Sequence, residues 1–374
     1  MTALGDVVDR LLGLGDERHR PASAIAGVRI GSESDVRAGG WAVLPGPGTV
    51  GVPMTRSLAL DLASVTKVAS TTTLGMCLVA QGQLDLEAPA QRYLPHFVGD
   101  ATVEQLLTHT AGLQPWWPLY CEPGDRDTAL HRLPLVAAPG TTWKYSDLGL
   151  ILAGLIIERI TTLTLAEAFQ KLIAEPLSLT ASYGPIPAEQ AVTSADSDAC
   201  EFQMIATGRP YAVPFTTESF DGWRHRALRG EVNDGNAAHA LGGVAGHAGL
   251  FSTVDDLLRL GAALQSGELF GHEVLERFAR PTTIQPDQAV GFRRTTRGPL
   301  TLLHHGGFTG TYFALGLERP VVIAGGAMRL YGTLGPLGSA FPTDRLVTGA
   351  EISACLLDGV VQLLDQSATA SEER

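Results

Sequence analysis

The chain has 374 residues, a formal net charge of −12, and 45% hydrophobic and 18% charged residues. Its length predicts two lobes or one large elaborated domain, and its composition is that of a globular protein that can build a core. The negative charge repels phosphate backbones and anionic lipids, which argues against nucleic acid or a membrane surface as a partner.

The predicted elements begin with an amphipathic helix over residues 3–14, followed by two strands at 25–30 and 36–44. The next part of the chain is predicted to be mainly helical, with helices over 64–81, 102–108, 147–161 and 165–174. Thr102 is placed to cap the second of these helices, and a loop rich in proline and tryptophan occupies 114–125.

The second half of the chain is less regular. Residues 182–240 are polar with few periodic apolar positions, and a glycine-rich loop at 242–253 precedes a helix over 254–265. Ser252 and Asp255 resemble a capping box at the start of that helix. Beyond it, the sequence predicts four short strands and a final helix, at 290–296, 300–304, 311–317, 321–328 and 344–364.

Predicted strands lie at both ends of the chain, and predicted helices fill its middle. The simplest architecture is an α+β fold, an α/β sandwich, in which the terminal helices flank one antiparallel sheet and a large helical region is inserted between its early and late strands. We predict a sheet lobe from residues 1–62 and 286–366, a helical lobe from 63–285 and a disordered tail at 367–374. A cleft between the lobes is the expected place of an active site.

The cysteines, the apolar runs and the first residues of the chain indicate the cellular compartment in which the protein is expected. No apolar run reaches the roughly 18–20 residues that cross a bilayer. Asp6 and Asp9 stand where a secretory signal has basic residues before its apolar stretch. The four cysteines lack a metal-ligand spacing and are interpreted as reduced, mostly buried thiols: Cys77, Cys121, Cys200 and Cys355. Together these features predict a cytoplasmic protein.

The strongest local signal for chemistry is Ser64-Val65-Thr66-Lys67, at the start of a predicted helix. A spacing of three residues places Ser64 and Lys67 on one helix face, within hydrogen-bonding reach. The positive end of the helix and burial both favour a neutral lysine, which would accept the serine proton. Such a tetrad also occurs by chance, but this chain holds only three lysines among 27 basic residues, and arginine cannot replace a lysine that acts as a base.

Two further motifs fit the same chemistry. Tyr145, at the boundary between an extended segment and the next predicted helix, could share a proton with Lys67 and pass it to a leaving group. His305-Gly306-Gly307-Phe308 follows an apolar run, and the N–H groups of Ser64 and Phe308 would form an oxyanion hole. Alternatively, Tyr145 is a core residue beside a helix N-cap, and residues 305–308 form an ordinary hairpin turn.

In this order, the three motifs resemble the S-x-x-K, Y-x-N and K-T-G series of class C β-lactamases, penicillin-binding proteins and related esterases and D-aminopeptidases. Longer segments resemble the same family, among them LLTHTAGL at 106–113, GGVAGHAGLFST at 242–253 and HHGGFTGTYF at 304–313. The resemblance covers about residues 20–330. It implies the β-lactamase/transpeptidase fold and an acyl-enzyme on Ser64, served by Lys67 and Tyr145.

Three positions depart from the family's pattern. Asp147 replaces the usual asparagine and cannot donate a hydrogen bond to a substrate amide, although it could hold Lys67 in place and keep it charged. His305 replaces the lysine of K-T-G, so a fixed cation for a β-lactam carboxylate is missing. Of the LTNR segment found in relatives, only Arg329 is retained. We therefore expect slow turnover of penicillins.

The sequence thus predicts ping-pong acyl transfer through Ser64 on a small ester or amide. The residues expected to bind substrate are Asp147, His305, Gly306, Gly307, Trp116 and Trp117, although the tryptophans could instead only anchor their loop. His109 and the loop around His247 are interpreted as structural.

Transfer of the acyl group to water would make the protein an esterase or peptidase, and transfer to an amine or alcohol acceptor would make it an acyltransferase. A non-catalytic scaffold of the same fold is the third alternative. The chemistry requires no metal and no organic cofactor.

Overall fold

The computed structural model describes residues 2–124, 129–130, 133–335, 337–338 and 345–372. Its main feature is a seven-stranded antiparallel sheet in the order β3-β2-β1-β12-β11-β10-β9. Strands from the two ends of the chain meet in the sheet, where β1 pairs with β12. The predicted α+β class is confirmed. The strands are β1 (Ser23–Ile30), β2 (Glu33–Val43), β3 (Val52–Pro53), β9 (Arg293–Arg297), β10 (Leu300–Gly306), β11 (Thr311–Gly316) and β12 (Val321–Ala327).

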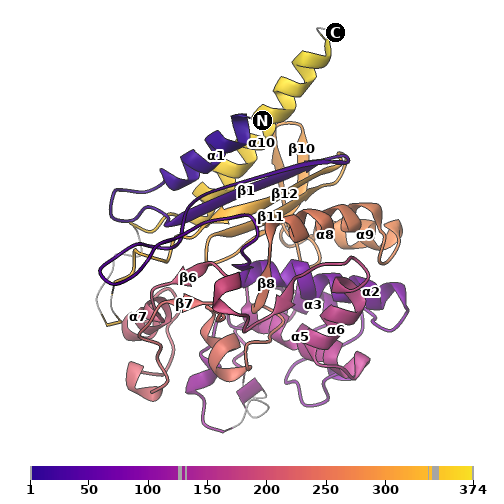
Figure 1. The fold of residues 1–374 in the computed structure, drawn as a ribbon. Coiled ribbons are helices and arrows are strands. Elements are labelled where there is room, and N and C mark those ends of the chain that lie inside the picture. The colour runs from indigo at the N-terminus through magenta and orange to yellow at the C-terminus, as the bar shows by residue number, and fades with distance from the viewer. Residues whose placement is uncertain (1, 125–128, 131–132, 336, 339–344, 373–374) are drawn as a thin grey trace.

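The terminal helices α1 (Thr2–Leu12) and α10 (Gly349–Glu372) lie side by side on one face of the sheet (Figure 1). The apolar residues that predict α1 are buried there: Leu4, Val7, Val8 and Leu11. Helix α10 continues through residues 367–372, where the sequence predicts a disordered tail. Extending an existing helix requires no new nucleus, and this explains the difference.

Helix α8 (Val254–Ser266) covers the opposite face of the sheet and is followed by α9 (His272–Ala279). Two glycines allow the close approach, because a Cβ at Gly27 of β1 would clash with Val254 and one at Gly261 of α8 with Val322. Helix α8 therefore packs with the sheet, although it falls within the segment 63–285 predicted as the helical lobe. Its N-cap is Thr253, one residue after the predicted Ser252.

The helical region lies on the far side of α8 and α9 from the sheet in Figure 1. A capping box between Thr102 and Gln105 starts α3, as expected at Thr102. A short sheet, β4-β8-β5, joins this region to the segment before Ser64, because β4 pairs with β8. The remaining elements are α2 (Thr73–Ala80), α3 (Val103–Leu107), α5 (Asp147–Thr161), α6 (Leu165–Phe169), β4 (Leu60–Asp61), β5 (Ser182–Tyr183), β6 (Thr193–Ala195), β7 (Leu228–Arg229) and β8 (Leu250–Ser252).

Residues 182–240, predicted as irregular, contain helix α7 (Ala199–Thr207). Only Ala199 and Ile205 of this helix are buried, so its sequence shows little apolar periodicity. Among the described residues, no single helix is long and apolar enough to span a membrane, and α5 with residues 165–174 passes that test only as a pair bent by 74°. The described part of the chain also contains no cluster of three or more His, Cys, Asp or Glu side chains that could hold a metal ion.

Candidate active site

Ser64 lies in a 3₁₀ turn, Ala63–Val65, between β4 and the helical segment that leads into α2. Ala63 has a φ of 44°, a left-handed conformation that is unfavourable for a residue with a Cβ and is typical of functional sites. The buried carboxylate of Asp61 supports the turn by accepting the N–H groups of Ala63 (2.9 Å) and Asn233 (2.6 Å). Burial raises the pKa of Asp61 to about 6. Ser64 is thereby held with part of its surface exposed.

Lys67 is fully buried at the first residue of a π-helical segment, Lys67–Thr72. Its Nζ donates to Ser64 Oγ (2.7 Å) and to the carbonyl of His247 (3.2 Å), and it forms an ion pair with Asp147 Oδ1 (2.7 Å). The structure therefore brings Ser64 and Lys67 together, as their spacing predicts. The glycine-rich loop contributes a carbonyl to the lysine, which agrees with a structural role for the segment around His247.

Asp147 changes the expected charge of this lysine. Burial alone would lower the pKa of Lys67, but the neighbouring Asp147 and Tyr145 outweigh burial and raise the Lys67 pKa above its ordinary value. The contact of 2.7 Å between Asp147 and Nζ thus favours the charged lysine, the alternative raised for Asp147, over the neutral lysine expected from the helix end and burial. Lys67 can accept a proton only after passing one on, and Asp147 is in contact to receive it.

Tyr145 stands two residues before the first residue of α5 and is positioned by His109. The Nδ1 of His109 lies 3.1 Å from the backbone nitrogen of Ser146, and the rings of His109 and Tyr145 are 4.6 Å apart. Burial lowers the pKa of His109 to about 3, so this histidine is neutral. Burial also raises the pKa of Tyr145, although Lys67 and the hydrogen bonds to Lys67 and Ser64 oppose that shift. Tyr145 therefore keeps its proton and can act as an acid.

The turn between β10 and β11 is tied to the segment that carries Ser64. The hydroxyls of Thr309 and Thr311 donate to the carbonyls of Asp61 and Leu62, both at 2.9 Å. A Cβ at Gly307 would clash with Leu62 and Thr311, so this close approach requires glycine. Arg329 donates from Nε to the carbonyl of Phe308 (2.8 Å), and its guanidinium lies 5.0 Å from the centre of the Phe308 ring. The backbone beside Ser64 is thus fixed on both sides of Phe308.

A cavity of about 1340 Å³ opens beside Ser64. Its wall includes most of the residues expected from the sequence: Ser64, Trp116, Tyr145, Asp147, Gly306, Gly307 and Phe308. Residues of α7, including Glu201 and Met204, and of the first turns of α10, including Gly349 and Ala350, also line it. Ligand pockets usually measure about 300–1,000 Å³, so this cavity has room for more than one small group.

Two residues expected to bind substrate do not line this cavity. His305 is buried with its ring 6.0 Å from that of Tyr145, and burial lowers its pKa well below the ordinary value. Alternate residues of a strand face opposite sides, so His304, and not His305, reaches the cavity. Trp117 donates its indole N–H to Glu122 (2.6 Å) and packs on Phe215. Trp117 thus anchors its loop, which was one of the two alternatives.

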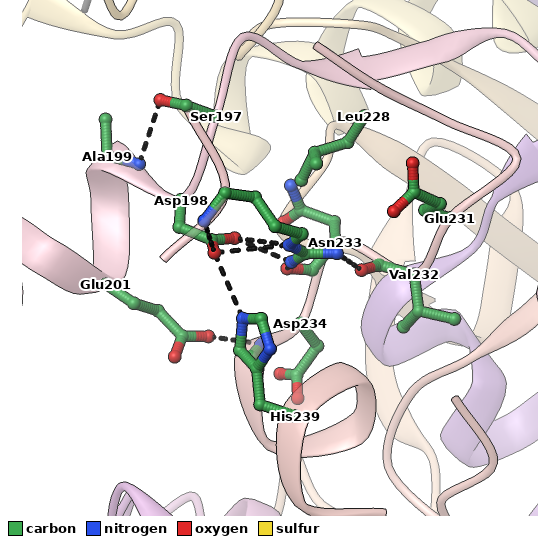
Figure 2. A network of polar contacts seen from close by, with 12 residues as sticks. Ser197, Asp198, Ala199, Glu201, Leu228, Glu231, Val232, Asn233, Asp234 and His239 are labelled. Atoms are coloured by element: carbon green, nitrogen blue, oxygen red, sulfur yellow. Dashed lines mark hydrogen bonds and ion pairs between the residues drawn. The ribbon is translucent and has the colours of Figure 1, made fainter. Parts of the chain in front are cut away.

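An acidic network that is not evident from the sequence forms the wall of the cavity near α7 (Figure 2). Asp198 accepts from Arg224 (2.6 Å to Nη2) and contacts His239 Nε2 (3.0 Å). Glu201 accepts from the Tyr120 hydroxyl (2.6 Å) and from the N–H of Gly235 (2.7 Å).

Burial, helped by Asp234, raises the pKa of Glu201 to about 8. Burial would also raise the pKa of Asp234, but His247, 2.8 Å away, outweighs it and lowers that pKa to about 2. The only sequence signal for this wall is the presence of acidic residues in a stretch without apolar periodicity.

Comparison with known proteins agrees with this fold. The beta-lactamase family model matches residues 8–333. N-acetylmuramyl-L-alanine amidase of Bacillus subtilis (strain 168) is 31% identical over 261 residues, which cover 63% of this chain and 57% of the amidase. Esterase EstB of Burkholderia gladioli is 31% identical over 335 residues, which cover 79% of this chain and 76% of the esterase.

Among solved structures, the fold is similar to that of "EstCE1, a hydrolase with promiscuous acyltransferase activity", with a TM-score of 0.67 and 17% identity over 89% of this chain and 96% of that one. The chain therefore belongs to the beta-lactamase family, in the superfamily of serine β-lactamases and penicillin-binding proteins. The family and the names of the relatives indicate a serine hydrolase-type enzyme. The match spans less than two thirds of the amidase's length.

Proposed function

We propose that the protein is a serine acyl-transfer enzyme that hydrolyses a small ester or amide through an acyl-enzyme on Ser64. The observation that carries the proposal is the contact of Lys67 Nζ with both Ser64 Oγ and Asp147 Oδ1, each at 2.7 Å. This arrangement gives the serine proton a path away from the nucleophile. The relatives' names, an amidase and an esterase, support the same substrate classes. The cytoplasmic location expected from the sequence stays a prediction.

In the proposed reaction, Lys67 passes a proton to Asp147 and accepts the proton of Ser64 as Oγ attacks the substrate carbonyl. The first transfer leaves the lysine and the aspartic acid neutral, which burial favours over separated charges, and the second returns Lys67 to its ammonium form while the negative charge moves to the oxyanion. The N–H groups of Ser64 and Phe308 would hold the oxyanion. Tyr145, which keeps its proton until then, donates it to the leaving group. Water then attacks the acyl-enzyme and gives a proton to Tyr145, while Lys67 returns a proton to Ser64 Oγ and regains its own from Asp147. An intact-mass measurement after mixing with small activated esters should show a transient acyl adduct, and its absence during turnover would contradict the proposal.

Asp147→Asn should change the pH dependence of the reaction. In the native pair, a proton moves from Lys67 to Asp147 without exchange with solvent, so kcat/KM should be nearly flat from neutral to mildly alkaline pH. Removing the carboxylate destabilises the ammonium form and lowers the pKa of Lys67. Activity of the variant should then rise with pH through this lowered Lys67 pKa. Measured kcat/KM profiles test this, with Asp85→Asn in the exposed Asp85–Arg92 pair as the control. Identical profiles for Asp147→Asn and the native protein would exclude the relay.

A second candidate function is acyl transfer to an amine or alcohol, favoured by the size of the cavity beside Ser64. The solved structure of similar fold is itself described as a hydrolase with promiscuous acyltransferase activity. The ratio of transfer product to hydrolysis product, measured with a simple ester and rising acceptor concentration, separates the two functions. A native transferase should show saturable transfer that outcompetes hydrolysis at millimolar acceptor. A ratio that rises only linearly, with water dominant throughout, would support plain hydrolysis.

A further inference from the structure

Asp61 joins the turn that carries Ser64 to the wall of the cavity. The residue is 1% exposed, and its Oδ1 accepts the N–H of Ala63 (2.9 Å) while its Oδ2 accepts the N–H of Asn233 (2.6 Å). Ala63 immediately precedes the nucleophile, and Asn233 lines the cavity. The two oxygens of one side chain therefore fix two segments that lie far apart in the sequence.

The segment around Asn233 is held from its other side by Arg224. The Nη1 of Arg224 donates to the carbonyl of Val232 (2.7 Å), and its Nη2 donates to the carbonyl of Asn233 (3.1 Å). Asp198 fixes the same guanidinium through a hydrogen bond of 2.6 Å to Nη2. Residues 232–234 are thus clamped between Arg224 and the carboxylate of Asp61.

The same segment leads to the loop that holds Lys67. Asp234 follows Asn233 and lies 2.8 Å from Nε2 of His247, whose carbonyl accepts from Lys67 Nζ (3.2 Å). The bond between Asn233 and Asp61 closes a ring of contacts that runs from the nucleophile turn through the cavity wall to Lys67. A change in the charge of Asp61 is therefore expected to affect the reactivity of the nucleophile.

The carboxylate of Asp61 is kept at a cost to stability. It forms no ion pair in the described part of the chain. Burial raises the pKa of Asp61 to about 6 against the two accepted N–H groups and Arg224, and Asp234 adds to the rise. Strand β8, which pairs with β4, and residues 307–311, which bond to the carbonyl of Asp61, carry no titratable side chain. An asparagine would avoid the buried charge but would offer one acceptor oxygen in place of two.

We propose that Asp61 is a positioning residue for Ser64, whose ionised carboxylate holds the nucleophile turn against the cavity wall. Protonation turns one of the two acceptor oxygens into a donor and releases one N–H group, so Ser64 loses its place beside Lys67. This role rests on the proposed function, because it concerns the nucleophile of that reaction. It adds an acidic limit: Ser64 should be reactive at neutral pH, where Asp61 is ionised, and weakly reactive in mild acid.

The rate constant for labelling of Ser64 by a fluorophosphonate, measured as a function of pH, tests this role. In the native protein it should fall in acid with a midpoint near the Asp61 pKa of about 6. Asp61→Asn should label at least about 10-fold more slowly at neutral pH, because one buried N–H loses its acceptor, and its rate constant should not decline through that midpoint. Thr309→Val is the matched control. It removes a hydroxyl that bonds to the carbonyl of Asp61 but leaves the carboxylate, so it should keep the native midpoint.

Asp234→Asn assigns the midpoint independently of the Asp61 variant. It removes a neighbouring charge that raises the pKa of Asp61, so it should move the midpoint of labelling to lower pH. A midpoint that persists in Asp61→Asn, that does not move in Asp234→Asn, or that is missing from the native protein would overturn the proposal. Labelling that follows the charge of Asp61 in a protein that turns over no ester would contradict the proposed function and leave the role of Asp61 supported.

Thermal unfolding supplies a readout that does not require a reactive serine. Asp61 has a pKa of about 6 in the folded chain and its ordinary value of 3.8 in the unfolded chain, so the folded chain binds more protons between these values. The unfolding temperature of the native protein should therefore fall relative to that of Asp61→Asn as the pH rises through this interval, and the difference should be constant above it. A difference that is independent of pH would show that Asp61 does not change its charge there, and would overturn the proposal.

Discussion

Ser64→Ala is expected to abolish covalent labelling and to lower kcat by about 10⁴–10⁶-fold, because the proposed acyl bond forms on the hydroxyl that this substitution removes. A fluorophosphonate should add one adduct to the native protein, and peptide mapping should locate it on Ser64. The strained turn at Ala63 and its anchor on Asp61 hold the hydroxyl at the cavity wall beside Lys67. The alanine variant keeps this backbone and loses only the nucleophile.

Ser57→Ala is the matched control, because Ser57 is exposed and its hydroxyl contacts only Thr55 in the described structure. Its labelling and turnover should equal those of the native protein. Thermal unfolding of both variants separates loss of the nucleophile from loss of the fold. An adduct that persists in Ser64→Ala, or native turnover by that variant, would exclude Ser64 as the catalytic nucleophile and favour the non-catalytic scaffold.

Lys67→Arg should lower kcat by about 10²–10⁴-fold, the usual cost of losing a general base. Arginine keeps the positive charge opposite Asp147, so the buried pair is not left with an uncompensated carboxylate. It cannot pass a proton on and accept another, because its pKa is far above that of lysine. The substitution therefore removes the proton relay while it retains the electrostatic contact.

Labelling kinetics and steady-state turnover measure this effect, with Lys171→Arg at an exposed position as the control. Lys67→Arg should react slowly with the fluorophosphonate, because Ser64 no longer loses its proton to a neighbour. Near-normal activity in Lys67→Arg would show that the lysine acts only as a cation. In that case Asp147 would have no part in proton transfer.

Several features could be predicted from local sequence because they depend on neighbours along the chain. The three-residue spacing of Ser64 and Lys67 places them in contact in any helical turn, and the structure shows Nζ and Oγ 2.7 Å apart. The amphipathic pattern of residues 3–14 predicts α1, and Thr102 predicts the start of α3. The positions of the predicted strands at both ends of the chain predicted one sheet with a helical insertion, whereas the order of the strands in that sheet is known only from the structure.

Other features depend on contacts between distant segments, so the sequence left them open. The charge of Lys67 depends on Asp147, which lies 80 positions along the chain and reaches Nζ only through the placement of α5. Of two motif residues outside the lining of the cavity, His305 lies beside Tyr145 and Trp117 anchors its loop. Helix α7 was not predicted, since its exposed side faces the cavity and leaves no apolar period to detect.

The sequence by itself determined the nucleophile motif, the candidate acid and the α+β class, because these follow from short spacings, strand and helix periods and a resemblance that spans most of the chain. Only the tertiary structure shows the contact of Asp147 that favours a charged Lys67 and the acidic wall around Glu201. The physical reason is that pKa values and unsatisfied hydrogen bonds depend on burial and on charges a few ångströms away in space. Those neighbours come from segments far apart in the sequence, which only the fold brings together.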